Sequence, residues 1–210
     1  MQSVRSPASI SDSFERGQRA LDVAVAILML VVCCPVFVLI AALVKITSHG
    51  PVLFRAERVG RGGRPFRLVK FRTMYVNADT AGPGITRACD PRVTSLGRWL
   101  RKFKLDELPQ LLNVLKGELS LVGPRPEDPR YVVRYTPEQL RVLSVRPGIT
   151  SIASVRYRHE GSLLSGPDWE AKYVNVVMQD KLRLELEYLD RRTLGSDIGV
   201  MWQTLLVLFR

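Results

Sequence analysis

The sequence predicts an α+β fold, in which a helical membrane segment precedes a small, mostly helical domain with one β-hairpin. Three patterns among the 210 residues support this class. They are an uncharged run at 23–44, apolar and basic segments around a glycine-rich turn at 60–63, and helical spacing of apolar residues from 96 onward. The length fits one domain of ordinary size with an appendage.

The uncharged run is long enough to meet a membrane, because about 20 apolar residues match a hydrocarbon core about 30 Å thick. Basic residues flank it on both sides, among them Arg16 and Arg19 before it and Lys45 and Arg55 after it. Since such residues favour the cytoplasmic side, two basic flanks favour a segment that enters and returns, with Pro35 as its break. A straight spanning helix that tolerates this proline explains the composition equally well.

Local patterns predict the hairpin and the first two helices of the domain. Residues 52–71 have the alternation and central turn of two antiparallel strands. Apolar residues then recur at helical spacing behind Thr94 or Ser95, either of which can cap a helix. A second helix is expected at 105–116, where a glycine follows.

The remaining elements follow in order. Paired prolines at 123–127 require an extended or turning segment. A helix is expected to begin at Thr136 and to stop before 146–148. Residues 168–190 are a helical candidate with alternating charge, and the apolar tail 198–209 is expected to pack on the core or the membrane surface.

Composition narrows the functional classes. The net charge is +11, which predicts an anionic partner such as nucleic acid, phospholipid or a phosphorylated substrate. The cysteines, Cys33, Cys34 and Cys89, form no CxxC pair, so neither a disulfide framework nor a zinc site is indicated. With only His49 and His159 present, a histidine-rich metal site or a Ser/His/Asp triad is poorly supported.

Two adjacent carboxylates, Asp106 and Glu107, are the candidate reaction centre. Pro109 is acceptable in the first turn of a helix, so both acids are expected in that turn. The helix dipole and nearby cations then favour their ionised forms, which suit a nucleophile or an oxygen ligand for Mg²⁺. The alternative is an ordinary pair of acids at a helix N-terminus.

Cations in loops and hairpin strands give the acids a context. Lys70, Arg72, Arg125 and Arg146 have this placement, and two of them adjoin prolines. Rigid arginine forks bind phosphate oxygens in pairs of hydrogen bonds, and a metal neutralises further charge of a pyrophosphate. We therefore expect a phosphate-binding site, although each of these residues can also be a plain surface cation.

Four motifs follow one another along the chain: Lys70-Phe71-Arg72-Thr73-Met74, Leu105-Asp106-Glu107-Leu108-Pro109-Gln110-Leu111, Ser120-Leu121-Val122-Gly123-Pro124-Arg125-Pro126-Glu127 and Arg146-Pro147-Gly148-Ile149-Thr150. In this order they resemble the bacterial sugar transferase family, the monotopic phosphoglycosyl transferases. The resemblance covers roughly residues 19–209. Each motif alone is weak evidence, whereas all four in order are specific.

The resemblance implies a reaction. Asp106 would attack the sugar-bearing phosphorus of a UDP-sugar, release UMP and carry the phosphosugar until polyprenyl (undecaprenyl) phosphate takes it over, giving polyprenyl diphosphate sugar. Glu107 would assist through Mg²⁺, with the metal held at Asp106 and Glu107. By motif position, Lys70, Arg72, Arg101 and Arg125 would hold the donor phosphates or uridine.

The resemblance also implies an organisation. Residues 1–18 would form a cytoplasmic leader and 19–47 a re-entrant helix, broken at Pro35, in the cytoplasmic leaflet of the bacterial inner membrane. Residues 48–210 would form a cytoplasmic catalytic domain that ends in a membrane-surface helix. Lys104 and Ser151 depart from the family, which usually has Ser or Thr at the first position and often glycine at the second.

Two other functions fit part of the sequence. A membrane-tethered basic protein that binds nucleic acid or anionic lipid explains the charge, but not the acidic pair within the basic region. With aromatic residues at 8%, no stacking platform for bases is evident, so nucleic acid is not the expected partner. A membrane-bound phosphohydrolase would use the same carboxylates and magnesium, with water as the acceptor.

Overall fold

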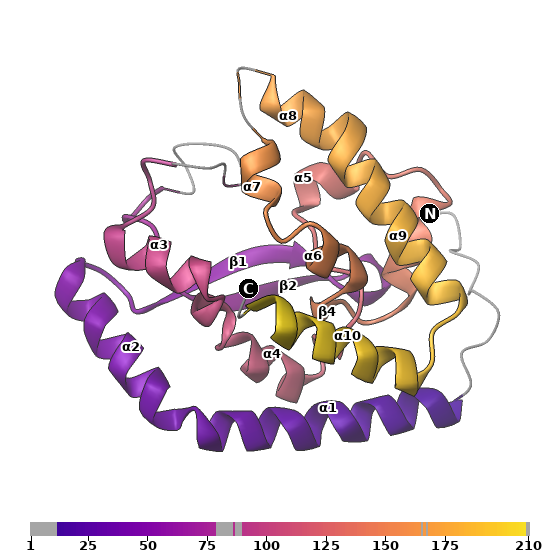
Figure 1. Cartoon of the computed structure of the whole chain (residues 1–210), viewed down its shortest axis with the longest axis horizontal. Coiled ribbons are helices and arrows are strands. Elements are labelled where there is room, and N and C mark those ends of the chain that lie inside the picture. Colours follow the sequence, from indigo (N-terminus) through magenta and orange to yellow (C-terminus); the bar gives the residue numbers. More distant parts are fainter. Residues whose placement is uncertain (1–11, 79–85, 87–89, 165, 167, 209–210) are drawn as a thin grey trace.

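The structure, a computed structural model, describes residues 12–78, 86, 90–164, 166 and 168–208. Its architecture is α+β and mostly helical, as predicted (Figure 1). The α-helices are α1 Asp12–Val32, α2 Cys34–Thr47, α3 Ser95–Lys102, α4 Gln110–Lys116, α5 Pro129–Val132, α6 Ile152–Arg156, α7 Glu160–Leu163, α8 Trp169–Lys172, α9 Met178–Asp190 and α10 Leu194–Leu208. The strands are β1 Leu53–Val59, β2 Pro65–Phe71, β3 Ser120–Val122 and β4 Gly148–Thr150. The 3₁₀ turns are η1 Arg61–Gly63, η2 Leu105–Glu107 and η3 Gln139–Ser144, and a π-helical turn, η4 Tyr173–Val177, joins α8 to α9.

The first two helices form a bent pair along one edge of the molecule (Figure 1). They meet at Cys33 with a bend of 63°. Pro35 lies in the first turn of α2, where its missing N–H breaks no helical hydrogen bond. Of the helices in the described ranges, none alone has the length and apolarity to cross a membrane, whereas the bent pair meets this test by length and composition.

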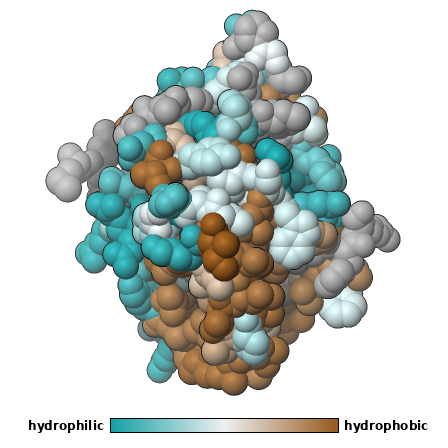
Figure 2. Space-filling view, turned by 90° about the vertical axis from the view of Figure 1, so that its left-hand side faces the viewer, coloured by the Kyte–Doolittle hydropathy of each residue, from teal (hydrophilic) through white to brown (hydrophobic). Residues whose placement is uncertain are grey.

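The outer side of this pair is apolar. Large hydrophobic side chains are exposed along it from Ile27 to Ile46, with Val31 69% and Ile46 81% exposed. Figure 2 shows the resulting apolar surface over the lower part of the molecule, below a hydrophilic upper part. An apolar area of this kind marks contact with a membrane or a protein partner.

The N-terminal half of α1 is attached to the domain by polar side chains. Arg19 donates to the carbonyls of Val114 and Leu115 at 2.6 and 2.9 Å, which satisfies the C-terminal end of α4. Asp22 accepts a hydrogen bond from the Leu121 N–H at 2.9 Å. α1 is therefore fixed both to α4 and to β3.

Two small sheets complete the framework. β1 and β2 pair antiparallel, which confirms the predicted hairpin. β3 and β4 pair parallel, with Ser120 opposite Gly148. This second sheet was not predicted. Gly148 allows its close backbone approach, because a Cβ there would lie 2.2 Å from the Gly123 nitrogen.

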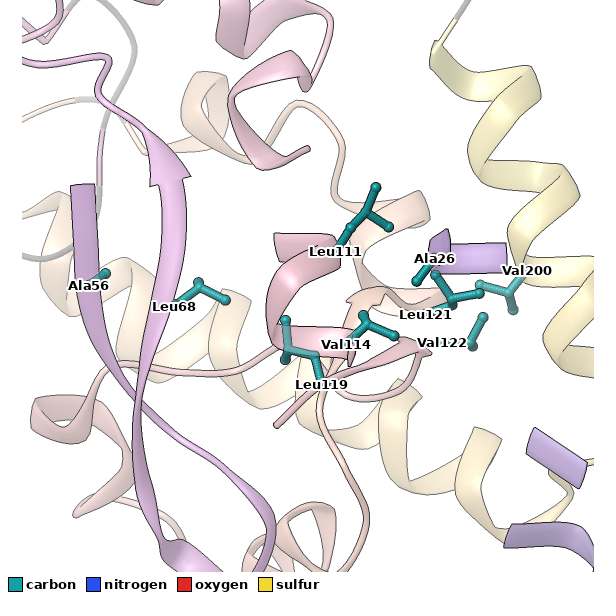
Figure 3. Close-up of a cluster of buried hydrophobic side chains, with 9 residues drawn as sticks. All are labelled: Ala26, Ala56, Leu68, Leu111, Val114, Leu119, Leu121, Val122 and Val200. Atoms are coloured by element: carbon teal, nitrogen blue, oxygen red, sulfur yellow. The ribbon is translucent and has the colours of Figure 1, made fainter. Parts of the chain in front are cut away.

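The main core lies between the hairpin, α4, α1, β3 and α10 (Figure 3). Its buried side chains are Ala26, Ala56, Leu68, Leu111, Val114, Leu119, Leu121, Val122 and Val200. α1 thus contributes Ala26 to the same core as the hairpin and α4.

The helix expected at 105–116 is broken in the structure. Lys104 takes a left-handed conformation with φ 57°, η2 follows, and α4 begins only at Gln110. Pro109 is the N-cap of α4 rather than a residue inside its first turn, since it has no N–H to donate to the preceding turn. Asp106 and Glu107 therefore lie in a separate 3₁₀ turn, and this part of the prediction is wrong.

The other helix predictions differ in outcome. Thr94 caps α3 by accepting from the Gly97 N–H at 2.9 Å, as expected. The helix expected from Thr136 is only the 3₁₀ turn η3, because the chain becomes extended at Val145. The helix at 168–190 is confirmed as α8, η4 and α9. The apolar tail forms α10, while residues 1–11 of the expected leader and Cys89 lie outside the described residues.

Candidate active site

The candidate acids lie in η2, between the end of α3 and the start of α4. η2 packs against β2, and the left-handed Lys104 turns the chain into this position. Asp106 and Glu107 are 6% and 8% exposed, so the turn buries two carboxylates together. Burial of a charge is costly unless partners compensate it, which makes their neighbours decisive.

Glu107 has three cationic neighbours. Arg125 donates from both terminal nitrogens, to Oε1 at 2.6 Å and to Oε2 at 3.3 Å. The ammonium nitrogens of Lys70 and Lys104 each lie 3.8 Å from Oε1. These residues come from β2, from the link between α3 and η2, and from the proline-rich segment after β3.

The charges around Glu107 determine its ionisation. Burial alone would raise the pKa of Glu107, but Arg125, Lys70 and Lys104 outweigh it and hold that pKa well below its usual range. The Glu107 carboxylate in turn raises the pKa of Arg125. Glu107 and Arg125 are therefore a charged pair at neutral pH, in which each carboxylate oxygen accepts one hydrogen bond from Arg125.

Asp106 differs from its neighbour. Its Oδ1 is buried and has no hydrogen-bond partner among the described residues. Burial and the adjacent Glu107 carboxylate raise the pKa of Asp106 despite the nearby charges of Lys70 and Arg101. The nearby cations act on Asp106 in the expected direction, but desolvation and the Glu107 charge exceed their effect, so the pKa of Asp106 is raised rather than lowered.

The predicted cations Lys70 and Arg101 also act on this centre. Burial lowers the pKa of Lys70 to about 8. Arg101 donates to the Thr73 hydroxyl at 2.8 Å, and its charge acts on Asp106. The structure therefore brings Lys70, Arg101 and Arg125 together with the two acids.

Two other candidates lie elsewhere. Arg72 is buried against the α2–β1 connection, where it donates to the backbone carbonyl and the hydroxyl of Ser48, each at 2.8 Å. Arg146 lines a cavity at the hairpin turn with Gly60 and Lys116. No hydrogen bond or ion pair in the described ranges joins Arg72 or Arg146 to the acids.

Three residues that hold or approach the charged side chains described above were not among the predicted site residues. Lys104, where the family usually has a capping Ser or Thr, approaches Glu107. Thr73 holds Arg101, and its place in the Lys70–Met74 motif was an available signal. Ser48 holds Arg72, and no sequence pattern indicated it.

The protein supplies only some of the ligands that a magnesium ion would need at this site. No group of three metal-ligating side chains occurs in the part of the chain that the structure describes. The unpartnered Asp106 Oδ1 is a free anionic oxygen when ionised, and Glu107 adjoins it. Because Mg²⁺ commonly takes one or two carboxylates together with substrate phosphates, these two acids are compatible with a metal shared with a phosphorylated ligand.

Comparisons with known proteins identify the family of the chain. The family model described as "Bacterial sugar transferase" matches residues 14–210. The UDP-glucose:undecaprenyl-phosphate glucose-1-phosphate transferase of Caulobacter vibrioides is 39% identical over 89% of this chain and 67% of that protein. The undecaprenyl-phosphate glucose phosphotransferase of Komagataeibacter xylinus is 37% identical over 96% of this chain. The chain spans only 37% of this second relative.

A third relative differs in the sugar that its name specifies. The UDP-N-acetylgalactosamine-undecaprenyl-phosphate N-acetylgalactosaminephosphotransferase of Aeromonas hydrophila is 41% identical over 66% of this chain and 33% of that protein. The relatives thus share an acceptor in their names and differ in the donor sugar.

Proposed function

Because the chain belongs to the bacterial sugar transferase family, we propose that it transfers a sugar 1-phosphate from a UDP-sugar to polyprenyl phosphate. The family prediction, and with it the expectation of a transferase, is confirmed by the match over 14–210. One observation carries the mechanism: a buried Asp106 with an unpartnered oxygen lies beside a Glu107 that three cations neutralise.

In the first proposed step, an Asp106 oxygen forms a bond to the phosphorus that carries the sugar. The bond from this phosphorus to the bridging oxygen breaks, and its electron pair leaves with UMP. The phosphosugar remains on Asp106 as an acyl phosphate. Lys70, Arg101 and Arg125 surround the acids and would bind the phosphate oxygens on which charge develops.

In the second step, an oxygen of polyprenyl phosphate attacks the same phosphorus. The Asp106 carboxylate leaves with its electron pair, and polyprenyl diphosphate sugar is released. Neither step requires a net proton when both phosphates are ionised. Two steps allow a soluble donor and a lipid acceptor to use one site in turn.

The environments of the two acids support Asp106 rather than Glu107 as the nucleophile. Arg125 engages both oxygens of Glu107, and its lowered pKa makes this carboxylate a weak base. Asp106 has a free oxygen and a raised pKa, so its ionised form is the more basic of the two. Glu107 instead holds Arg125 and Lys70 in place.

Magnesium is part of the proposal. When bound by Asp106, Glu107 and the donor, the ion would neutralise charge on the pyrophosphate. Lys70, Arg101 and Arg125 would also neutralise part of this charge. Each of them is held in place by a carboxylate or hydroxyl group of the protein.

We also propose that α1 and α2 form a re-entrant helix pair, broken at Pro35, in the cytoplasmic leaflet of the bacterial inner membrane. The exposed apolar side chains from Ile27 to Ile46 and the 63° bend support this. Ala20 and Thr47 would then both lie on the cytoplasmic side, with the catalytic domain. Single cysteines at these positions, in a chain whose native cysteines are serine, should resist an impermeant maleimide in spheroplasts and react after lysis. Labelling of one of them in intact spheroplasts would indicate a spanning helix.

The reaction is tested by UMP release from a panel of UDP-sugars, with magnesium, with and without undecaprenyl phosphate. Asp106→Asn should abolish transfer, because an amide is a poor nucleophile and cannot carry the phosphosugar. The matched control is Asp190→Asn on α9, where the aspartate side chain is 53% exposed. Near-normal turnover by Asp106→Asn would refute the nucleophile.

The same assay separates the other candidate functions. Free sugar phosphate formed without lipid would indicate a phosphohydrolase. DNA binding that weakens with salt, in a folded protein that turns over none of the UDP-sugars, would indicate a basic binding protein.

A further inference from the structure

A basic cavity lies at the tip of the hairpin, apart from the two acids. It has a volume of about 590 Å³, within the range of about 300–1,000 Å³ typical of small-molecule sites. It is lined by the turn between β1 and β2, the end of α4 and the segment before β4. Four of its lining residues are cations and one is an acid: Arg61, Arg64, Lys116, Arg146 and Glu118.

The acids near this cavity are already engaged. Glu15 of α1 accepts two hydrogen bonds from Arg61, at 2.7 and 3.0 Å. Glu118 accepts from the Asn113 amide at 2.7 Å. Arg61 is therefore compensated, and Glu118 has a partner of its own.

The other three cations have no such compensation. The side chains of Arg64, Lys116 and Arg146 make no hydrogen bond or ion pair with any residue that the structure describes, apart from a longer-range attraction of Arg146 to Glu15. Arginine forks match phosphate oxygens, and lysine adds a point charge. Three free cations around one cavity are suited to a ligand with more than one phosphate charge.

The backbone of the cavity is well fixed. The Gly60 N–H donates to the Arg64 carbonyl at 2.8 Å, and Arg61 also donates to the Ser144 carbonyl at 3.0 Å. Gly62, with φ 68°, has no atom within 4 Å of a built Cβ, so the space in front of the turn is open. Arg19 covers the last carbonyls of α4, which reduces the negative end of this helix dipole near Lys116.

The hairpin side of the cavity is distant from Lys70 and from the apolar surface, whereas the Arg146 backbone lies beside Gly123, two residues before Arg125. Pro65, in its wall, is five residues along β2 from Lys70, which is about 17 Å in an extended strand. Glu15 lies twelve residues before Ile27, the first large exposed apolar residue of α1, or about 18 Å along a helix. A soluble anion therefore reaches the cavity more readily than a lipid head group.

We propose that this cavity binds a soluble phosphorylated organic anion of nucleotide size. Arg64, Lys116 and Arg146 would bind its phosphates, and Phe66 in the cavity wall would contact its apolar part. This second site is independent of the transfer reaction proposed above. Its ligand would bind without entering the chemistry at Asp106.

The test is protection of Lys116 from acetylation, followed by mass spectrometry on the full chain in detergent. ADP should slow acetylation of Lys116 at least fivefold in a saturable manner. Lys172, an exposed lysine of α8 outside the cavity, should react at an unchanged rate. Arg64→Gln should remove the protection, whereas Arg55→Gln, an exposed arginine of the same hairpin outside the cavity, should keep it.

Two outcomes would overturn the proposal. One is an unchanged rate at Lys116 at ADP concentrations up to several millimolar. The other is protection by phosphatidylglycerol vesicles, but not by phosphatidylcholine vesicles or ADP, which would assign the cavity to lipid head groups. Because acetylation needs no turnover, an inactive protein would leave this test valid, and its failure would not affect the test of Asp106.

Discussion

The pair formed by Arg125 and Glu107 allows a quantitative test of the site. Removal of one partner from a buried ion pair costs about 3–5 kcal/mol, because the other charge stays buried. The Arg125 side chain is 30% exposed and Glu107 9%, so we take the lower end, about 3 kcal/mol, for Arg125→Ala. In a chain of this size, each kcal/mol of lost stability lowers Tm by about 2–4 °C, so we expect Arg125→Ala to lower Tm by about 6–12 °C.

The assay is thermal unfolding in detergent, followed by circular dichroism, for Arg125→Ala, Glu107→Gln and the double variant. The double variant should lose less free energy of unfolding than the sum of the two single losses, because it leaves neither charge of the pair without its partner. We expect the difference, the coupling energy, to be at least about 1.5 kcal/mol. Arg183→Ala serves as the control, since its ion pair with Glu187 is exposed and its loss should leave Tm unchanged.

Strict additivity would refute this reasoning. If Arg125→Ala lowered Tm by less than 2 °C and the two changes simply added, the pair would not compensate buried charge. Loss of UMP release in such a stable Arg125→Ala protein would then mean that Arg125 acts on the substrate alone.

Three more predictions follow from the same geometry. Lys70 is protonated below its pKa of about 8, so kcat/KM should fall as pH rises through 8. Lys70→Arg should move this fall to higher pH, because arginine stays charged. If the fall stayed at the same pH, Lys70 would not be the group that causes it. Gly97→Ala would place a Cβ 2.1 Å from the Thr73 carbonyl oxygen and should prevent normal folding. Gly199→Ala should be tolerated, because no atom lies within 4 Å of its Cβ. Equal Tm values for the two variants would contradict this packing. Glu107→Gln should reduce turnover and its dependence on magnesium, and an unchanged magnesium titration would remove Glu107 from the metal site.

Sequence reasoning worked where the signal was local. The hairpin has apolar alternation and a glycine-rich turn within 20 consecutive residues, and both strands were found. Thr94 caps α3 through a hydrogen bond to a residue three positions later, so this end was also predictable. Such features depend on neighbours in the chain, which a sequence displays directly.

It was less successful where tertiary contacts decide the structure. β3 and β4 are three residues each and pair across more than 20 intervening residues, so neither stood out as a strand. The left-handed Lys104 separates η2 from α4, although the apolar pattern continues through it. Burial then raises the pKa of Asp106, which no count of neighbouring cations could reveal.

The presence of an arginine in one of the four motifs did not show how close its side chain lies to the two acids. Arg125 and Arg146 both adjoin prolines, yet one contacts Glu107 and the other faces the hairpin turn. The segments that carry them run side by side, with Gly123 against Gly148, and their side chains reach different surroundings. The prolines were correctly expected to keep 123–127 out of a helix, but the direction in which each arginine points depended on the unpredicted parallel sheet.

The polar attachment of α1 has a practical consequence for protein production. A shortened chain that starts after residue 47, designed to remove the apolar helices α1 and α2, would also lose Arg19, Asp22 and Ala26. The carbonyls at the end of α4 would lose the Arg19 side chain as a donor, the Leu121 N–H would lose Asp22 as its acceptor, and the main core would lose the side chain of Ala26. Solubility is therefore better sought by replacing exposed apolar side chains between Ile27 and Ile46 than by truncation.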